Sequence, residues 1–467
     1  MRRKQRTMNN HSPFTAETYT ERRGILKSKL AGGAVVLLGN DESSSNFKDN
    51  WYHFRQDSTF LYYTGISVAG LVLFIDAAGG EEILFGNELG IDDIIWTGPL
   101  PTLQELAAQA GINKVLPLAD LPKYITGNIH YLPPYRPEHS VKLSAWLNKK
   151  IDEVESNASV LLIKAIASQR IYKTAGELEQ LDNAATVTSR MHRAVIMHAR
   201  EGMYEYEIAG IAQKILWEHH AHNSFQPIVT INGNVLHNHS YGNIFSAGKM
   251  LLFDAGAELM NGYCGDMTRT IPAGEKFDTR QKDIYNIVHN AYCKAVSLLK
   301  PGIRFKDVHL AACAAIAGGL KQIGLMKGDV QEAVNAGAHA MFFQCGLGHL
   351  LGLDVHDMEN LGEPYIGYTD ELKKSKEFGL KSLRLGKEIE AGYVLTIEPG
   401  IYIIPELIDM WKAKGLHNNF INYDLLETYK DFGGIRVEDD YAITEDGCRL
   451  LGESLAIAVN DVEAMRG

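Results

Sequence analysis

Residues 250–270 read MLLFDAGAELMNGYCGDMTRT, and acidic residues stand at the ends of apolar runs in this stretch. The apolar run 251–253 leads directly into Asp254, and eleven residues separate Asp254 from Asp266. Between them, residues 260–262 read MNG, which is typical of a tight turn. We therefore predict two short strands joined by a hairpin, which would bring the two carboxylates together.

Three more stretches of the C-terminal half place an acid or a histidine beside apolar residues. Four carboxylates and one imidazole at one point would repel unless positive charge lay between them. Oxygen ligands with one histidine suit Mn²⁺, Co²⁺, Fe²⁺ or Zn²⁺, so a metal site is the prediction if these residues converge. The three stretches are GLGHLLGLDVHD (346–357, with His349), IEPGIY (397–402, with Glu398) and GIRVEDD (434–440, with Glu438).

The order and the local sequences of these stretches resemble the metal signature of the methionine aminopeptidase, prolidase and aminopeptidase P superfamily. The matching words are DAGAE, GDMTRT, GLGHLLGLDVHD, IEPGIY and GIRVEDD, which together span about 200 residues. The resemblance implies a pita-bread α+β catalytic domain that binds two divalent metal ions. We expect Mn²⁺, with Co²⁺, Fe²⁺ or Zn²⁺ as alternatives.

The resemblance implies a role for each metal ligand. Asp254 would chelate one ion through both carboxylate oxygens, and Asp266 and Glu438 would bridge the two ions. His349 and Glu398 would complete the separate coordination shells. A water between the ions would be the nucleophile, and Glu398 would also carry its proton to the leaving amine.

The resemblance also implies residues that contact the peptide. His237 matches a histidine near the amino end of the substrate and the scissile bond, while His239 has a weaker claim. His356 matches one that stabilises the tetrahedral intermediate. Tyr402 and Arg436 match residues of the pocket beyond the scissile bond in aminopeptidase P.

Cys345 departs from the family pattern, because the family normally has a further histidine at this position before the metal histidine. The position is expected to line the pocket for proline, where a cysteine cannot carry a positive charge. Two interpretations stay open: altered substrate preference or weakened turnover, and a tolerated exchange in a small neutral pocket. No activating base beside Cys345 is evident, so we do not expect it to be a nucleophile.

The N-terminal third has a different pattern, in which strand-length apolar runs such as AVVLLGN (34–40) alternate with turn residues and a helical stretch at 103–110. This pattern predicts an α/β domain. Residues 54–65, FRQDSTFLYYTG, resemble the signature of the aminopeptidase P N-terminal domain, which methionine aminopeptidases lack. We expect a creatinase-like α/β domain at 1–168 and the pita-bread domain at 169–467.

Periodic apolar residues predict long helices after the expected domain boundary, and two further segments interrupt the catalytic half. The segment 359–388 is rich in Lys and Glu and is interpreted as a solvated face. The segment 405–432 contains Trp411 and several other aromatic residues, and is interpreted as a cap over the site or a subunit contact. The predicted helices are 174–200, 204–220, 281–299 and 305–323, and further strands are predicted at 393–397 and 441–444.

Composition excludes several other classes of protein. The 467 residues carry a formal net charge of −11, which opposes general binding of nucleic acid. Apolar runs long enough to span a membrane are not found, and the basic first residues lack a secretory apolar segment. Five cysteines suit reduced thiols in the cytoplasm. The resemblance implies a homodimer or homotetramer.

The predicted function is a metalloaminopeptidase that cleaves between an N-terminal residue and a following proline, with peptides carrying proline at the second position as substrates. A prolidase, which takes Xaa-Pro dipeptides, shares the fold and ligands and is the first alternative. A catalytically silent binding protein is the second, although all five metal-ligand positions of the family are filled. Creatinase, which works without metal, is disfavoured for the same reason.

Overall fold

The computed structural model describes residues 12–238 and 240–467, so His239 lies outside the described residues. The chain forms two compact units. The first contains 12–170 together with the short segments 260–262 and 358–366, and the second contains the remainder. None of the helices in the described residues combines the length and apolar character needed to cross a membrane.

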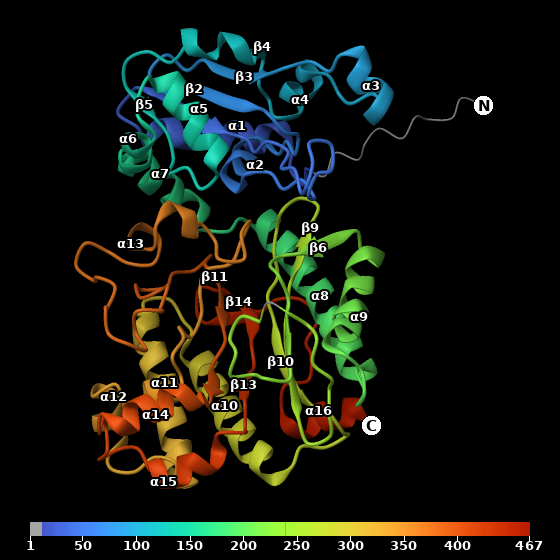
Figure 1. The fold of residues 1–467 in the computed structure, drawn as a ribbon. Coiled ribbons are helices and arrows are strands. Elements are labelled where there is room, and N and C mark those ends of the chain that lie inside the picture. Colours follow the sequence, from blue (N-terminus) through green and yellow to red (C-terminus); the bar gives the residue numbers. More distant parts are fainter. Residues whose placement is uncertain (1–11, 239) are drawn as a thin grey trace. The chain divides into compact units, whose positions relative to one another are not determined.

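The first unit is an α/β domain, as the sequence predicted (Figure 1). The predicted helix at 103–110 is present, and its first turn is closed by a capping box between Thr102 and Glu105. The elements of this unit are α1 (Ala16–Ser28), β1 (Ala34–Leu38), α2 (Ser58–Thr64), β2 (Val72–Asp76), β3 (Glu82–Gly86), α3 (Ile91–Thr97), α4 (Leu103–Gln109), β4 (Lys114–Pro117), η1 (Leu118–Lys123), β5 (Ile129–His130), α5 (Pro137–Leu147), α6 (Ile151–Ser156), α7 (Val160–Arg170), η3 (Glu359–Leu361) and α13 (Glu363–Ile366).

A five-stranded sheet in the order β4-β3-β2-β1-β5 forms the centre of this unit. β2 pairs antiparallel with β1 and β3, whereas the outer strands β4 and β5 join in parallel. All five residues of β1 are buried, which explains its uninterrupted apolar run. Val36 and Phe74 belong to one core cluster with Leu143 of α5 and Val154 of α6, so these helices cover one face of the sheet.

The second unit is the α+β pita-bread domain. An order of two helices followed by short strands occurs twice along it, and each helix pair, α8 with α9 and α10 with α11, packs side by side (Figure 1). The elements of this unit are α8 (Ala175–His198), α9 (Glu205–Glu218), β6 (Ala221–Asn223), β7 (Ile228–Thr230), β8 (Met250–Asp254), β9 (Ala257–Leu259), β10 (Thr268–Pro272), α10 (Thr279–Leu298), α11 (Phe305–Gln322), α12 (Val330–Asn335), η2 (Ala338–Met341), β11 (Val394–Ile397), β12 (Gly400–Tyr402), α14 (Pro405–Ala413), α15 (Tyr423–Leu426), η4 (Glu427–Tyr429), β13 (Gly434–Arg436), β14 (Asp439–Ile443), β15 (Cys448–Leu450) and α16 (Val459–Arg466).

The four predicted long helices are confirmed as α8 to α11, within a few residues at each end. Their limits follow from local chemistry. α8 begins after Thr174, whose hydroxyl accepts from the backbone N–H of Glu177, and α10 begins after Asp278 in the same way. The chain leaves α11 through Gly324, which has a φ of +84° that favours glycine.

Strand pairing brings the predicted metal-ligand positions together. β8 and β10 form the predicted hairpin, in which Asp254 lies opposite Thr268. The backbone N–H of Glu438 donates to the carbonyl of Thr268 at 3.1 Å, which joins the start of β10 to the segment between β13 and β14. The backbone N–H of Thr396 in β11 donates to the carbonyl of His349 at 3.0 Å. β11 also pairs with β14, so four segments far apart in the sequence, around positions 268, 349, 396 and 438, meet at neighbouring backbones.

Glycines permit the close approach of these backbones. A Cβ at Gly348 would lie 2.0 Å from the carbonyl oxygen of Thr396, and a Cβ at Gly256 would lie 1.9 Å from the carbonyl oxygen of Gly265. Such contacts exclude any side chain. The glycines in the words DAGAE and GLGH are thus required for packing around the ligands.

Both inserted segments combine exposed stretches with a few buried residues. Much of 359–388 is exposed, which agrees with a solvated face, but Leu383 and Leu385 are buried. In 405–432, Trp411 is buried and its ring lies 5.9 Å from that of Phe378. Trp411 therefore packs inside the second unit.

A buried guanidinium fixes the central strands. Arg269 in β10 is 1% exposed, and its Nη2 pairs with Asp439 at 2.8 Å. Its Nη1 donates to the backbone carbonyl of Glu438 at 2.7 Å, and Nε donates to that of Ala456 at 2.8 Å. Arg269 therefore holds β10, the start of β14 and the C-terminal segment in one arrangement.

We expect Arg269→Met to lower the free energy of unfolding by about 3–5 kcal/mol, because Asp439 would keep a buried charge without its partner. Chemical denaturation followed by tryptophan fluorescence measures this change. Arg449→Met is the matched control, since Arg449 pairs with Asp182 at the surface at 2.8 Å and its loss should cost less than about 1 kcal/mol. Equal losses in the two variants would contradict the role given to Arg269.

Candidate metal centre

Three buried side chains from separate segments form the centre of the site. The ligand atoms of Asp266, His349 and Glu438 all lie within 4.8 Å of one another. The Nε2 atom of His349 is 3.4 Å from Oδ2 of Asp266 and 3.6 Å from Oε1 of Glu398. The structure therefore brings together four of the five ligands that the resemblance implied.

The orientation of His349 suits a metal ligand. Its Nδ1–H donates to the backbone carbonyl of Leu350 at 3.0 Å, which leaves the lone pair on Nε2 facing the carboxylates. Its backbone N–H donates to Oγ1 of Thr396 at 3.2 Å. Such outer contacts fix the tautomer and ring orientation of metal-binding histidines.

The fifth predicted ligand, Asp254, is paired with Arg436. Nη2 of Arg436 contacts Oδ2 of Asp254 closely, while its Nε donates to Oγ1 of Thr268 at 3.0 Å. The Thr268 hydroxyl in turn donates to Oε2 of Glu438 at 2.7 Å. Arg436 also donates from Nη1 to the hydroxyl of Tyr402 at 2.8 Å. One guanidinium therefore links the carboxylate cluster to the residues predicted for the proline pocket.

Burial makes the carboxylates unfavourable as a group of anions. Burial, and then the charge of Asp254, raises the pKa of Asp266 well above its usual range. Burial and the charge of Asp266 do the same for the pKa of Glu438, and burial raises the pKa of Glu398. Each shift reflects negative charge without enough compensation from water or neighbouring cations.

The side chains present fit divalent cations. Oδ1 of Asp254 and Oδ1 of Asp266 are buried and have no hydrogen-bond partner within the described residues. Buried polar atoms are almost always partnered, so these two oxygens are available to bind a cation. Carboxylate oxygens with one imidazole are a donor set for Mn²⁺, Co²⁺, Fe²⁺ or Zn²⁺. A cation would supply the positive charge that the neighbouring side chains do not provide to the carboxylates.

Both predicted catalytic histidines lie beside this cluster. The ring of His356 is half-buried and lies 4.3 Å from that of His349, in an edge-to-face arrangement. His237 is on the surface, and partial burial and then the charge of Arg436 lower its pKa. Asp254 opposes part of this shift, which places His237 within electrostatic reach of the ligands.

Cys345 lies next to Tyr402 and faces the same charges. Its thiol interacts with the Tyr402 hydroxyl, and the charges of Arg436 and Glu398 both act on it. Burial raises the pKa of Cys345 to about 11, so the thiol is neutral at physiological pH. A neutral thiol is a poor nucleophile.

The sequence missed three residues of the site. Asp440 accepts the backbone N–H of Asp266 at 2.9 Å, and Thr268 makes the contact to Glu438 described above. Both stand inside words that were singled out, so their position next to the ligands was the available signal. Arg384, whose charge lowers the pKa of both His237 and Cys345, belongs to the segment interpreted as a solvated face. Arg384 itself is half-buried, so its charge acts on the site as well as facing solvent.

Comparison with known families agrees with this geometry. The sequence model described as metallopeptidase family M24 matches residues 179–445, and that of the aminopeptidase P N-terminal domain matches residues 19–132. The chain belongs to metallopeptidase family M24. It is therefore a metal-dependent peptidase, and its M24 domain carries the cluster built around His349.

Individual relatives of this M24 peptidase cover nearly its whole length. It is 31% identical to the Xaa-Pro dipeptidase of Rattus norvegicus, over 93% of this chain and 89% of the relative. It is also 31% identical to a probable Xaa-Pro aminopeptidase, pepP, of Metarhizium robertsii, over 93% and 92%. The solved structure of zinc-substituted E. coli aminopeptidase P in complex with product has a TM-score of 0.80 at 27% identity, with 97% of this chain and 98% of that one covered.

We expect Asp266→Asn to separate metal binding from stability. Removing one buried carboxylate relieves repulsion, so the chelator-treated variant should melt no lower than chelator-treated wild type. Added Mn²⁺ should raise the Tm of wild type but not that of the variant. At an Mn²⁺ concentration of 100 times Kd, binding should raise the free energy of unfolding of wild type by about 2.7 kcal/mol. Differential scanning calorimetry measures both effects.

Asp446→Asn provides the control, because Asp446 is an exposed loop carboxylate. This variant should keep the full Mn²⁺ response. A metal-dependent rise in Tm that survives in Asp266→Asn would remove Asp266 from the ligand set.

Proposed function

We propose that this M24 peptidase removes the N-terminal residue from peptides whose second residue is proline. The observation that carries the proposal is the direct contact between the metal cluster and the Arg436–Tyr402 pair. The same guanidinium contacts Asp254 and donates to the Tyr402 hydroxyl. A pocket built on this pair would lie immediately beyond the bond that the metal centre attacks.

Five side chains would hold the metal ions, and Mn²⁺ is our proposal for the native metal. The residues proposed to hold them are Asp254, Asp266, His349, Glu398 and Glu438. When bound, the cations would polarise the scissile carbonyl and lower the pKa of a water to near neutral pH. Carboxylate oxygens in this number favour Mn²⁺ over softer ions.

Glu398 is the proposed proton carrier. Its side chain is 18% exposed, whereas those of Asp266 and His349 are 5% and 4% exposed, so Glu398 is the carboxylate that a substrate reaches. A carboxylate in this position can accept and release a proton during the reaction. Glu398 would accept a proton from the attacking water and donate it to the nitrogen of the leaving proline.

The two histidines beside the cluster are proposed to contact the peptide. His356, packed against His349, would donate a hydrogen bond to the carbonyl oxygen as negative charge develops on it. His237, on the exposed side, would position the amino end of the substrate. Cys345 and Tyr402 would then line the space for the proline ring.

A dipeptidase is the second candidate, and Arg384 favours it. The charge of Arg384 acts on both His237 and Cys345, so a guanidinium lies near the proposed peptide path. A dipeptide ending in proline has a free carboxylate at that point, and Arg is well suited to bind a carboxylate. A longer peptide has a neutral amide there instead.

Two properties stay predictions from the sequence. We propose a cytoplasmic location, and all five cysteines are free thiols, which suits a reducing compartment. A homodimer or homotetramer is also proposed from the resemblance. Subcellular fractionation and light scattering measure these two properties.

Cleavage of matched peptides tests the proposed function. Metal-stripped protein reloaded with Mn²⁺ would be given an Xaa-Pro dipeptide, an Xaa-Pro-Yaa-Zaa tetrapeptide and a Met-Ala-Ser peptide, with products identified by mass. We expect release of the first residue from the tetrapeptide and no cleavage of Met-Ala-Ser. Cleavage of the dipeptide alone would make the chain a dipeptidase, and cleavage of neither proline peptide would contradict both candidates.

The variant Arg384→Met sharpens this experiment. If Arg384 binds a terminal carboxylate, its loss should raise KM for the dipeptide at least about tenfold and leave the tetrapeptide nearly unchanged, since a charged hydrogen bond contributes about 1.5–3 kcal/mol. Lys381→Met removes an exposed cation of the same segment and should change neither substrate. Equal effects of Arg384→Met on both peptides would show that Arg384 does not determine which peptide length the site prefers.

We expect Cys345→His to raise kcat/KM on Xaa-Pro peptides, because an imidazole restores hydrogen bonding that a neutral thiol lacks. Steady-state assays of both peptides measure the gain. Cys293→His serves as the control, since Cys293 is exposed on α10. A loss of activity in Cys345→His would instead make the cysteine an adaptation of this pocket.

A further inference from the structure

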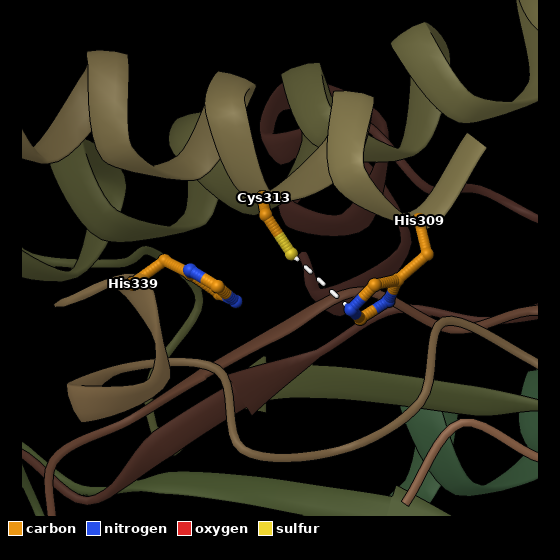
Figure 2. A group of neighbouring side chains, drawn as sticks. All are labelled: His309, Cys313 and His339. Carbon is orange, nitrogen blue, oxygen red and sulfur yellow. Dashed lines mark hydrogen bonds between the residues drawn. The ribbon is translucent and has the colours of Figure 1, made fainter. Parts of the chain in front are cut away.

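A second cluster of metal-binding side chains lies in the M24 domain, away from the carboxylates described above. His309 and Cys313 stand on α11, and His339 stands on the short helix η2 (Figure 2). Their exposed fractions are 0%, 0% and 1%, so water does not reach them. None of the three has a part in the proposed peptidase chemistry.

The geometry directs all three side chains to one point. His309 and Cys313 are four residues apart, which puts them on the same face of α11. Cys313 Sγ lies 3.4 Å from His309 Nε2, and the tip of the His339 ring points toward this pair in Figure 2. One ligand atom from each residue lies within 4.8 Å of the other two.

Three of the four imidazole nitrogens are unusual because they lack hydrogen-bond partners in the described part of the chain. Within the described residues, His309 Nδ1 and both ring nitrogens of His339 have no hydrogen bond of normal geometry. Burial lowers the pKa of His309 to about 3 and that of His339 to about 4, and a weak contact to the Val334 backbone offsets part of the latter shift. Both rings are therefore neutral at physiological pH, which is the form that binds metals.

We propose that His309, Cys313 and His339 form a binding site for a monovalent soft metal ion, Cu⁺. Thiolate and imidazole are ligands that Cu⁺ favours. One Cu⁺ with one thiolate and two neutral imidazoles has no net charge, which suits a site without water. Zn²⁺ on the same ligands would leave a buried positive charge.

The surroundings of the cluster support the choice of a monovalent ion. Among the described residues, no further His, Cys, Asp or Glu belongs to the group, whereas structural zinc sites almost always have four ligands. The ring of Phe343 lies 5.5 Å from that of His309, and the charge of Lys306 acts on His309. An apolar wall and a nearby cation both oppose extra positive charge.

Metal binding at this site exchanges a proton for the ion. Burial raises the pKa of the Cys313 thiol, so the free site holds S–H. Binding breaks the S–H bond, forms a bond between sulfur and copper, and releases one proton to solvent, without oxidation or reduction when copper enters as Cu⁺. Nε2 of His309 lies beside the sulfur. After the thiol proton has left, this nitrogen would bind the metal.

The full-length chain, expressed with added copper and purified without oxygen and without an affinity tag, tests the proposal. We expect one copper per chain by mass spectrometry of the metal, and an X-ray absorption spectrum with sulfur and nitrogen neighbours. Cys313→Ser should lower Cu⁺ affinity in competition with bicinchoninate by more than the roughly 10–100-fold that loss of an outer-shell partner costs. His339→Gln, which leaves α11 untouched, should do the same.

A pair on α10, in which Cys293 is exposed and His289 is half-buried, supplies the matched control. His289 and Cys293 have the same spacing, with Sγ 3.6 Å from Nε2, but they are not part of a group of three. Cys293→Ser should therefore keep the full copper content. Wild type that binds no copper, copper that persists in both Cys313→Ser and His339→Gln, or preferential loading with Zn²⁺ would each overturn the proposal.

Discussion

Repulsion between buried carboxylates is the constraint on which the catalytic unit depends. Asp254, Asp266, Glu398 and Glu438 are held at one point by backbone pairing and not by attraction between their side chains. The approach of the backbones requires glycine, as at Gly348. The fold thus holds these anions in place against their repulsion, and this arrangement prepares a site for cations.

Two buried arginines each pair with one carboxylate around this site. Arg269 neutralises Asp439 on the outer side of the strands, and Arg436 pairs with Asp254 at the edge of the cluster. Neither is hydrogen-bonded to Oδ1 of Asp266, which has no partner among the described residues. The protein therefore neutralises Asp439 but leaves one oxygen of Asp254 and one of Asp266 for metal ions, which places the cationic charge where the reaction needs it.

The same domain contains two donor sets of opposite character. The cluster around His349 offers mainly carboxylate oxygens, which suit hard divalent ions, while the group at His309, Cys313 and His339 offers sulfur and nitrogen. Their burial has different consequences. Buried carboxylates need added positive charge, whereas the second group is neutral before binding and stays neutral with a monovalent ion.

The sequence by itself determined the α/β character of the first unit and the long helices, and it singled out the residues that we predict as metal ligands, because apolar periodicity, capping residues and the family motifs are local features. It did not indicate that the charge of Arg384 acts on His237, because the sequence around a charged residue does not show which distant side chain it approaches. The group of His309 and His339 was missed for a similar reason, because its members lie 30 positions apart on different elements. Only the tertiary structure decided these contacts, since burial and distance across the chain fix the chemistry of a side chain as much as its identity does.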